Sequence, residues 1–110
     1  MTAMIRVESG QFARELQGLA IVVNGQDVGV IDGPVTEVET PKGWSIIVLG
    51  HGIGRSAPAR FHAYADDVIK VEVHRYEDDR VPGGGLLGGR YYLDVTHPRP
   101  LPAHPEATPA

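Results

Sequence analysis

Histidine, arginine and serine within a glycine-rich segment are the residues whose types and spacing point most directly to chemistry. Residues 50–57 read Gly-His-Gly-Ile-Gly-Arg-Ser-Ala, and the backbone N–H groups of such a loop, helped by an arginine, can cradle an anion. A dinucleotide-binding loop also needs a helix N-terminus directly after it, whereas Pro58 and a predicted strand follow here. One hypothesis is therefore a small anion or ligand site at His51, Arg55 and Ser56. The other is a structural loop at a corner of the fold.

Other arrangements that carry chemistry are incomplete in this sequence. The five histidines, at positions 51, 62, 74, 97 and 104, show no compact metal-ligand spacing, and the acidic pairs do not continue into a calcium-binding loop. None of the three serines lies in a Gly-x-Ser-x-Gly elbow. We predict no catalytic residue, no metal site and no cofactor. Because a catalytic triad is defined by geometry, an enzyme stays open as an alternative.

A short motif in the C-terminal tail points to a docking function. Residues 99–105 read Arg-Pro-Leu-Pro-Ala-His-Pro and fit Arg-x-x-Pro-x-x-Pro, in which spaced prolines hold an extended helix and the arginine meets an acidic pocket of an SH3-like groove. The motif predicts partner docking at Arg99, Pro102 and Pro105. Five of the nine prolines fall after Thr96, so a plain flexible tail is the alternative.

Composition limits the classes of partner. The chain has 110 residues, a net charge of −4 and scattered cations, which disfavours nucleic-acid binding through bulk positive potential. No apolar run reaches the roughly twenty residues of a membrane span, and the N-terminus lacks the apolar core of a signal peptide. The absence of cysteine excludes disulfides and suits a reducing compartment. We expect a cytoplasmic protein that binds no nucleic acid and has no membrane span.

Short β-strands are the elements that must position these residues. Asn24 and Gly25 stand between two β-rich runs, and both residues of a type I′ hairpin turn need the positive φ that this dipeptide supplies. A two-residue loop puts five apolar side chains on one face of the hairpin. The cross-strand pairs that it predicts are Val23 with Gln26, Ile21 with Val28 and Leu19 with Val30.

A second hairpin is predicted over residues 59–76. Only a three-residue loop at residues 65–67 sets the apolar faces of the two strands on the same side of a sheet. The register that follows pairs Phe61 with Val71, Ala63 with Ile69 and, as an outward ion pair, Arg60 with Glu72.

The whole pattern indicates an all-β protein. Strands are also predicted at residues 3–8, 35–39, 44–49 and 90–95, with one turn of helix within residues 9–18. The run at residues 44–49 is apolar enough to be a central strand covered on both faces. We predict a single small antiparallel β-sandwich of seven to eight short strands over residues 1–96, with a disordered proline-rich tail at residues 97–110.

Three segments resemble the PEGA-type repeat. They are residues 21–29 (Ile-Val-Val-Asn-Gly-Gln-Asp-Val-Gly), 41–48 (Pro-Lys-Gly-Trp-Ser-Ile-Ile-Val) and 61–73, which is similar to the closing hairpin of the family. The resemblance covers about residues 18–76. Asp32-Gly33-Pro34 replaces the expected Thr-Pro, and residues 77–110 have no counterpart. The resemblance implies a β-sandwich used as a binding or spacer module, without catalytic residues.

Three functions follow as hypotheses. The first is a non-catalytic binding or protein-interaction module that presents a sheet edge or its glycine loops to a protein partner. The second is a small-ligand-binding protein or enzyme that uses residues 50–56 with residues 83–89, which a pocket lined by His51, Arg55 and a tyrosine would favour. The third is a homo-oligomer that buries Leu86 and Leu87 against a neighbouring copy.

Overall fold

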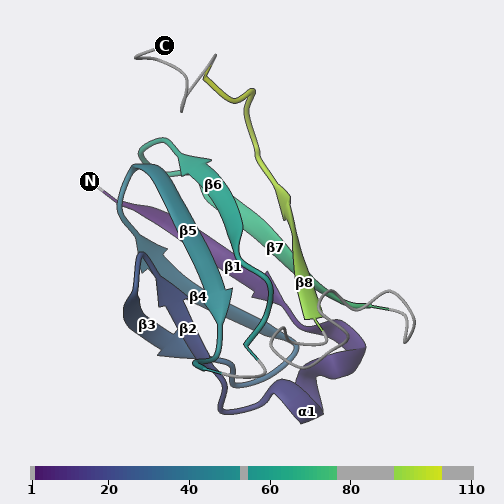
Figure 1. Ribbon diagram of the computed structural model, residues 1–110. Coiled ribbons are helices and arrows are strands. Elements are labelled where there is room, and N and C mark those ends of the chain that lie inside the picture. The colour runs from purple at the N-terminus through teal and green to yellow at the C-terminus, as the bar shows by residue number, and fades with distance from the viewer. Residues whose placement is uncertain (1, 53–54, 77–90, 103–110) are drawn as a thin grey trace.

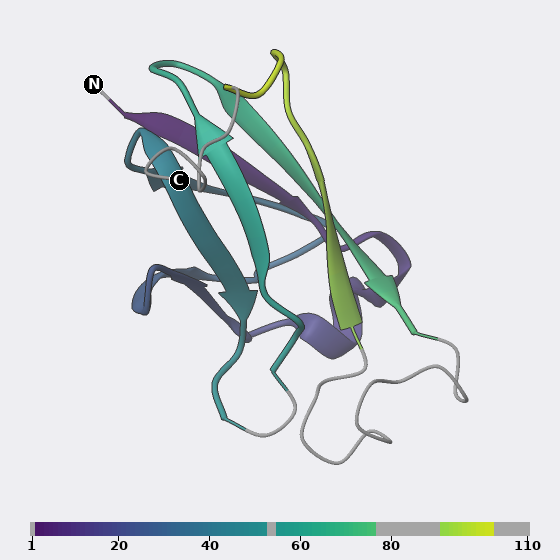
Figure 2. The same cartoon turned by 45° about the horizontal axis from the view of Figure 1, so that its top comes forward.

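The chain forms two four-stranded sheets that pack face to face in the computed structural model, which describes residues 2–52, 55–76 and 91–102 (Figures 1 and 2). Sheet A has the strand order β4 (Val35–Thr40), β1 (Ala3–Glu8), β7 (Val68–Arg75), β8 (Tyr91–Thr96). Sheet B has the order β3 (Gln26–Val30), β2 (Ala20–Val23), β5 (Gly43–Leu49), β6 (Ala59–Ala63). The predicted all-β class is confirmed, and the pairing is antiparallel except between β1 and β7.

A single helical connection joins β1 of sheet A to β2 of sheet B. It consists of a 3₁₀ turn, η1 (Gly10–Phe12), and one turn of helix, α1 (Ala13–Leu16), as the sequence predicts. Leu16 is buried in the core and anchors this connection. Among the described residues, no helix is long and apolar enough to cross a membrane.

The turn between β2 and β3 confirms the first hairpin. Asn24 has φ 52° and Gly25 has φ 82°, so both residues adopt the positive φ of a type I′ turn. Val23 pairs with Gln26 directly beside the turn, as predicted.

Further from the turn, the predicted register is wrong. The pairing shifts at a β-bulge between Ile21 and Val22, and Val30 is 53% exposed instead of facing the core. A bulge adds one residue to one strand and thereby exchanges the faces beyond it. Ile21 pairs with Gly29 and not Val28, and Ala20, not Leu19, pairs with Val30.

The close approach of β4 explains why the inward position beyond the bulge is a glycine. A Cβ added to Gly29 would stand 2.6 Å from Cγ1 of Val38 on β4, well inside any real contact. The bulge therefore places the residue without a side chain where the edges of the two sheets come together.

The second predicted hairpin is also wrong, because its two strands belong to different sheets. β6 pairs with β5 in sheet B, whereas β7 pairs with β1 and β8 in sheet A. Phe61 and Val71 are both fully buried, but they enter the core from opposite sheets. Arg60 and Glu72 therefore lie in different sheets, and their cross-strand neighbours are Ile46 and Asp94, respectively. Alternation shows which side chains are buried, not whether two strands are neighbours.

We expect Gly29→Ala to destabilise the fold by about 1–3 kcal/mol, because its methyl group overlaps Val38. The free energy of unfolding in urea measures this cost. Gly33→Ala is the matched control, since its added Cβ meets nothing within 4 Å.

A double-mutant cycle tests the proposed cause. Adding Val38→Ala removes the overlapping Cγ1, so Gly29→Ala should cost less in that background than in the native protein. An equal cost in both backgrounds would show that the clash is not the reason for the glycine.

Candidate functional site

A groove of about 420 Å³ lies on the outer face of sheet B. Its floor is apolar because Val22 of β2 and Ile46 and Val48 of β5 alternate with residues that face the core. Ile46 is 43% exposed, so the prediction that both faces of this strand are covered is wrong for the described residues. The residues that line the groove are Val22, Asn24, Gly25, Ile46, Val48, Gly50, His51, Gly52 and Arg55.

Two of the three residues predicted for a ligand site stand at one end of this groove. His51 Nε2 lies 2.8 Å from Asp27 Oδ1 of β3, and Arg55 Nη1 donates to the carbonyl of Gly52 at 2.9 Å. His51 and Asp27 are each 61% exposed, so the pair remains open to solvent. The polar end of the groove therefore offers an imidazole and a guanidinium beside an apolar floor.

Ser56, the third predicted residue, has a structural role instead. It is 3% exposed, its Oγ accepts the N–H of Leu49 at 2.9 Å, and it donates to the carbonyl of Ala57 at 3.1 Å. Since its hydroxyl group is already used within the loop, Ser56 does not face a ligand. No tyrosine lines the groove in the described part of the chain, so the pocket expected for the ligand-binding alternative is only partly present.

Asn24 contributes to the groove in a way that the turn signal does not reveal. Its Oδ1 accepts the N–H of Ile46 at 3.0 Å, and its Nδ2 donates to Ser45 Oγ at 3.2 Å. The side chain thus ties the hairpin turn to β5 and holds the groove floor in place. No sequence signal predicts these bonds, because they require β2 and β5 to be neighbours.

An aromatic row continues the outer face of sheet B beyond the groove. The His62 ring lies between Trp44 and Tyr64, with ring centroids 5.1 and 4.6 Å apart. The Arg60 guanidinium stands 5.8 Å from the Trp44 ring centre. These residues were not predicted as functional, although the alternation of residues 60 and 62 on β6, continued by residue 64 just beyond the strand, was a usable signal.

The beginning of the C-terminal tail is bound to the sandwich. His97 Nε2 accepts the N–H of His62 at 3.0 Å, and Arg99 Nε lies 2.7 Å from Asp67 Oδ1 and its guanidinium 5.3 Å from the Tyr64 ring. Arg99, predicted to dock a partner, is thus engaged within its own chain. Pro102 is half-buried, and Pro105 lies outside the described residues, as do Leu86 and Leu87.

Electrostatics favour this attachment of the tail. Burial acts to raise the pKa of Asp67, but the Tyr64 N–H and the Arg99 guanidinium outweigh it and lower the pKa below its ordinary value of 3.8. Burial lowers the pKa of His97 below 6.5, and nearby His62 adds to this effect while Asp67 opposes it. Neutral His97 and ionised Asp67 are the forms that make the observed bonds.

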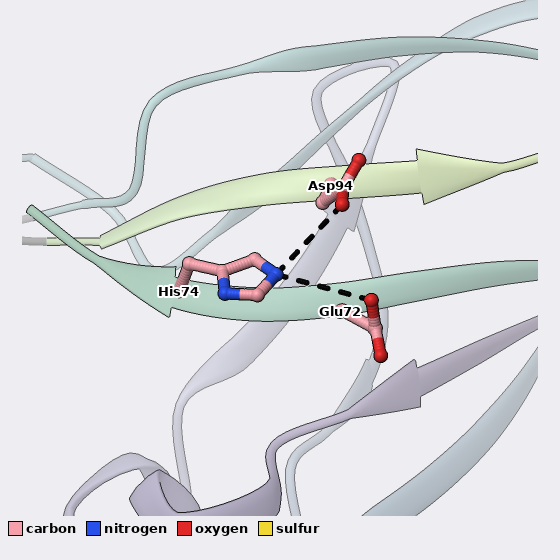
Figure 3. Close-up of side chains that lie close together, drawn as sticks. All are labelled: Glu72, His74 and Asp94. Atoms are coloured by element: carbon pink, nitrogen blue, oxygen red, sulfur yellow. Dashed lines mark ion pairs between the residues drawn. The ribbon is translucent and has the colours of Figure 1, made fainter.

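The outer face of sheet A brings together three side chains that are typical metal ligands. Glu72 and His74 project from β7 and Asp94 projects from β8, with their ligand atoms within 4.8 Å of one another (Figure 3). The sequence prediction of no compact ligand set overlooked that residues two apart on a strand share a face. The third residue, Asp94, becomes a neighbour only through the pairing of β7 with β8.

We expect the free energy of unfolding to decrease as the pH is lowered, because the folded protein keeps His97 neutral. A folded-state pKa below 6.5 means that its contribution is complete above pH 6.5 and is lost as the pH falls through the lower folded value. The midpoint of urea unfolding across this range measures the loss. His97→Gln should flatten the dependence, whereas Gly33→Ala, which changes no titratable group and adds a Cβ that meets nothing within 4 Å, should leave it in place. Identical profiles for His97→Gln and the native protein would contradict this role.

Three comparisons with known proteins identified no relative of this chain. No family model, no curated protein and no solved structure matches the chain. The resemblance of residues 18–76 to PEGA-type repeats therefore stays a prediction, and the functional argument rests on the surfaces of the sandwich.

Proposed function

We propose that the protein is a non-catalytic β-sandwich binding module that receives a protein partner on the outer face of sheet B. The observation that carries this proposal is the open groove whose floor is formed by Val22, Ile46 and Val48. An apolar floor with an arginine and an imidazole at one end suits a partner segment that carries an apolar side chain next to a carboxylate.

The contrast between the two outer faces supports sheet B as the binding face. On sheet A the outward positions are mostly charged and joined by ion pairs, such as Arg6 with Glu8 at 3.3 Å and Lys70 with Glu72 at 3.4 Å. On sheet B, Ile46 and Tyr64 are exposed and stand among further apolar and aromatic side chains. Sheet A also exposes Val35, Val68 and Tyr92, but its outer face carries the ion pairs, whereas Val22, Ile46 and Val48 of sheet B together form the floor of a groove. An apolar area that is hollowed in this way is typical of an interaction site.

The outer face of sheet B is more accessible to a partner than the β6 edge of the same sheet. An edge strand binds an extended peptide through its unpaired backbone groups. On β6, the outward N–H of His62 is already bonded to His97, and the N–H of Tyr64, just beyond the strand, is bonded to Asp67. The tail therefore occupies part of the edge that such a peptide would need, while the groove over β2 and β5 stays open.

Two further expectations belong to the same proposal. The resemblance to PEGA-type repeats implies a binding or spacer module, which agrees with a non-catalytic role. The lack of cysteine suits a reducing compartment, so we place the module in the cytoplasm.

We expect Ile46→Asp to weaken capture of the partner at least about tenfold, because a carboxylate on the groove floor has to be desolvated on binding. The measurement is affinity capture from native lysate with the immobilised full chain, followed by quantification of each retained protein. Val35→Asp is the matched control, since Val35 is 42% exposed against 43% for Ile46 and lies on the other sheet. Equal recovery by Ile46→Asp and Val35→Asp would contradict a binding face on sheet B.

A small anionic ligand is the second candidate, favoured by the volume of the groove. About 420 Å³ lies within the range of roughly 300–1,000 Å³ that is usual for small-molecule sites. In this case a ligand found in a metabolite screen should raise the melting temperature of the native protein. At a concentration a hundredfold above its Kd, the ligand should add about 2.7 kcal/mol to the free energy of unfolding. Arg55→Gln should abolish the shift, and Arg14→Gln, an exposed arginine on α1, should preserve it. An unchanged shift in Arg55→Gln would exclude this site.

A further inference from the structure

We propose that Glu72, His74 and Asp94 form a binding site for a divalent transition-metal ion of the Zn²⁺ class on the outer face of sheet A. His74 Nε2 lies 3.8 Å from Glu72 Oε1 and 3.8 Å from Asp94 Oδ2, and the three ligand atoms are within 4.8 Å of one another. Figure 3 shows both carboxylates directed toward the same ring nitrogen.

The sheet itself places the three ligands. Glu72 and His74 are two residues apart on β7 and therefore share a face, and Asp94 on β8 is the cross-strand partner of Glu72. Because β7 is paired on both sides, by β1 and β8, the backbone under Glu72 and His74 belongs to the interior of the sheet, while Asp94 stands on the edge strand β8. The site thus needs no folding of a loop to form.

Aromatic stacking orients the imidazole. The His74 ring stacks on Tyr92, its cross-strand partner, with centroids 5.3 Å apart and an interplanar angle of 24°. Tyr92 in turn contacts Tyr76, with centroids 4.9 Å apart. This stack holds the ring so that Nε2 faces the two carboxylates.

The distances suit an ion better than hydrogen bonds. At 3.8 Å, His74 Nε2 is too far from either carboxylate for a hydrogen bond. Ligands that bind Zn²⁺ at about 2.0–2.2 Å in a tetrahedral site stand about 3.4 Å apart. A small inward shift of the half-buried Glu72 and the exposed Asp94 side chains brings all three ligand atoms to this spacing.

The local charges also favour a cation. Glu72 and Asp94 are like charges directly opposite on paired strands, which is an unfavourable arrangement by itself. The Lys70 ammonium group partly neutralises the Glu72 carboxylate, since its Nζ lies 3.4 Å from Glu72 Oε2. The same Nζ lies 3.8 Å from Glu8 Oε1. Lys70 thus approaches the oxygen of Glu72 that does not face His74, and Oε1 stays directed to the proposed ion.

The donor set indicates the class of metal. Ca²⁺ and Mg²⁺ prefer sites made of oxygen ligands, and Cu⁺ prefers sulfur, whereas one imidazole with two carboxylates suits Zn²⁺ and neighbouring divalent ions. Three protein ligands leave a fourth position for water or for a group from a partner.

Calorimetric titration of the full chain with ZnCl₂ tests the site. We expect one ion per chain, and affinity at least about tenfold lower in His74→Asn, Glu72→Gln and Asp94→Asn. His51→Asn is the matched control, because that imidazole also pairs with a carboxylate, Asp27 at 2.8 Å, but lies outside the cluster. All four variants change partly or largely exposed side chains, and thermal unfolding verifies that each retains the fold.

A spectroscopic measurement locates the ion independently. Paramagnetic Cu²⁺ should broaden the NMR signals of the Tyr92 ring, stacked on His74, before those of Trp44 on the opposite sheet. The proposal is overturned if the native chain takes up no Zn²⁺, if His74→Asn binds as tightly as the native chain, or if Trp44 broadens first. Displacement of Zn²⁺ by an equal concentration of Mg²⁺ would likewise overturn it, because the imidazole would then have no part in binding.

Discussion

Buried Asp67 holds together the end of the sandwich at which the chain passes from sheet B to sheet A. Its carboxylate accepts the Tyr64 N–H and pairs with Arg99, while its backbone carbonyl accepts the N–H of Met4 at the start of β1. One residue thereby joins the β6–β7 crossover, the first strand and the tail. A carboxylate that is 5% exposed is stable only with such partners, so the crossover and the attachment of the tail depend on one another.

The crossover also explains why the two outer faces differ. Because β6 and β7 enter different sheets, the outward residues of β6 join those of β5 to make an apolar and aromatic face, whereas the outward residues of β7 join those of β1 and β8 to make a charged one. The proposed partner groove and the proposed metal site lie on these opposite faces. Each can therefore be occupied without contact with the other, on a core that both faces share.

Predictions from the sequence succeeded where local geometry decides the outcome. The Asn24-Gly25 turn, the helical turn after β1 and the strand positions follow from φ preferences and from alternation, which act within a few residues. The candidate site was predicted in part, since His51 and Arg55 line the groove but Ser56 is consumed by its own loop. The bulge beyond Ile21 was not predicted, because the approach of Val38 to Gly29 that accompanies it comes from the other sheet.

The sequence by itself determined that this chain is an all-β protein with short strands, a type I′ hairpin and a glycine loop carrying an imidazole and a guanidinium. Only the tertiary structure decided which strands are neighbours, because burial alternation is the same for two strands beside each other and for two strands facing each other across a core. That choice separated Arg60 from Glu72, placed Asp94 beside Glu72 and left Ile46 exposed on an uncharged floor. Both proposed sites are consequences of strand pairing, which local sequence patterns do not encode.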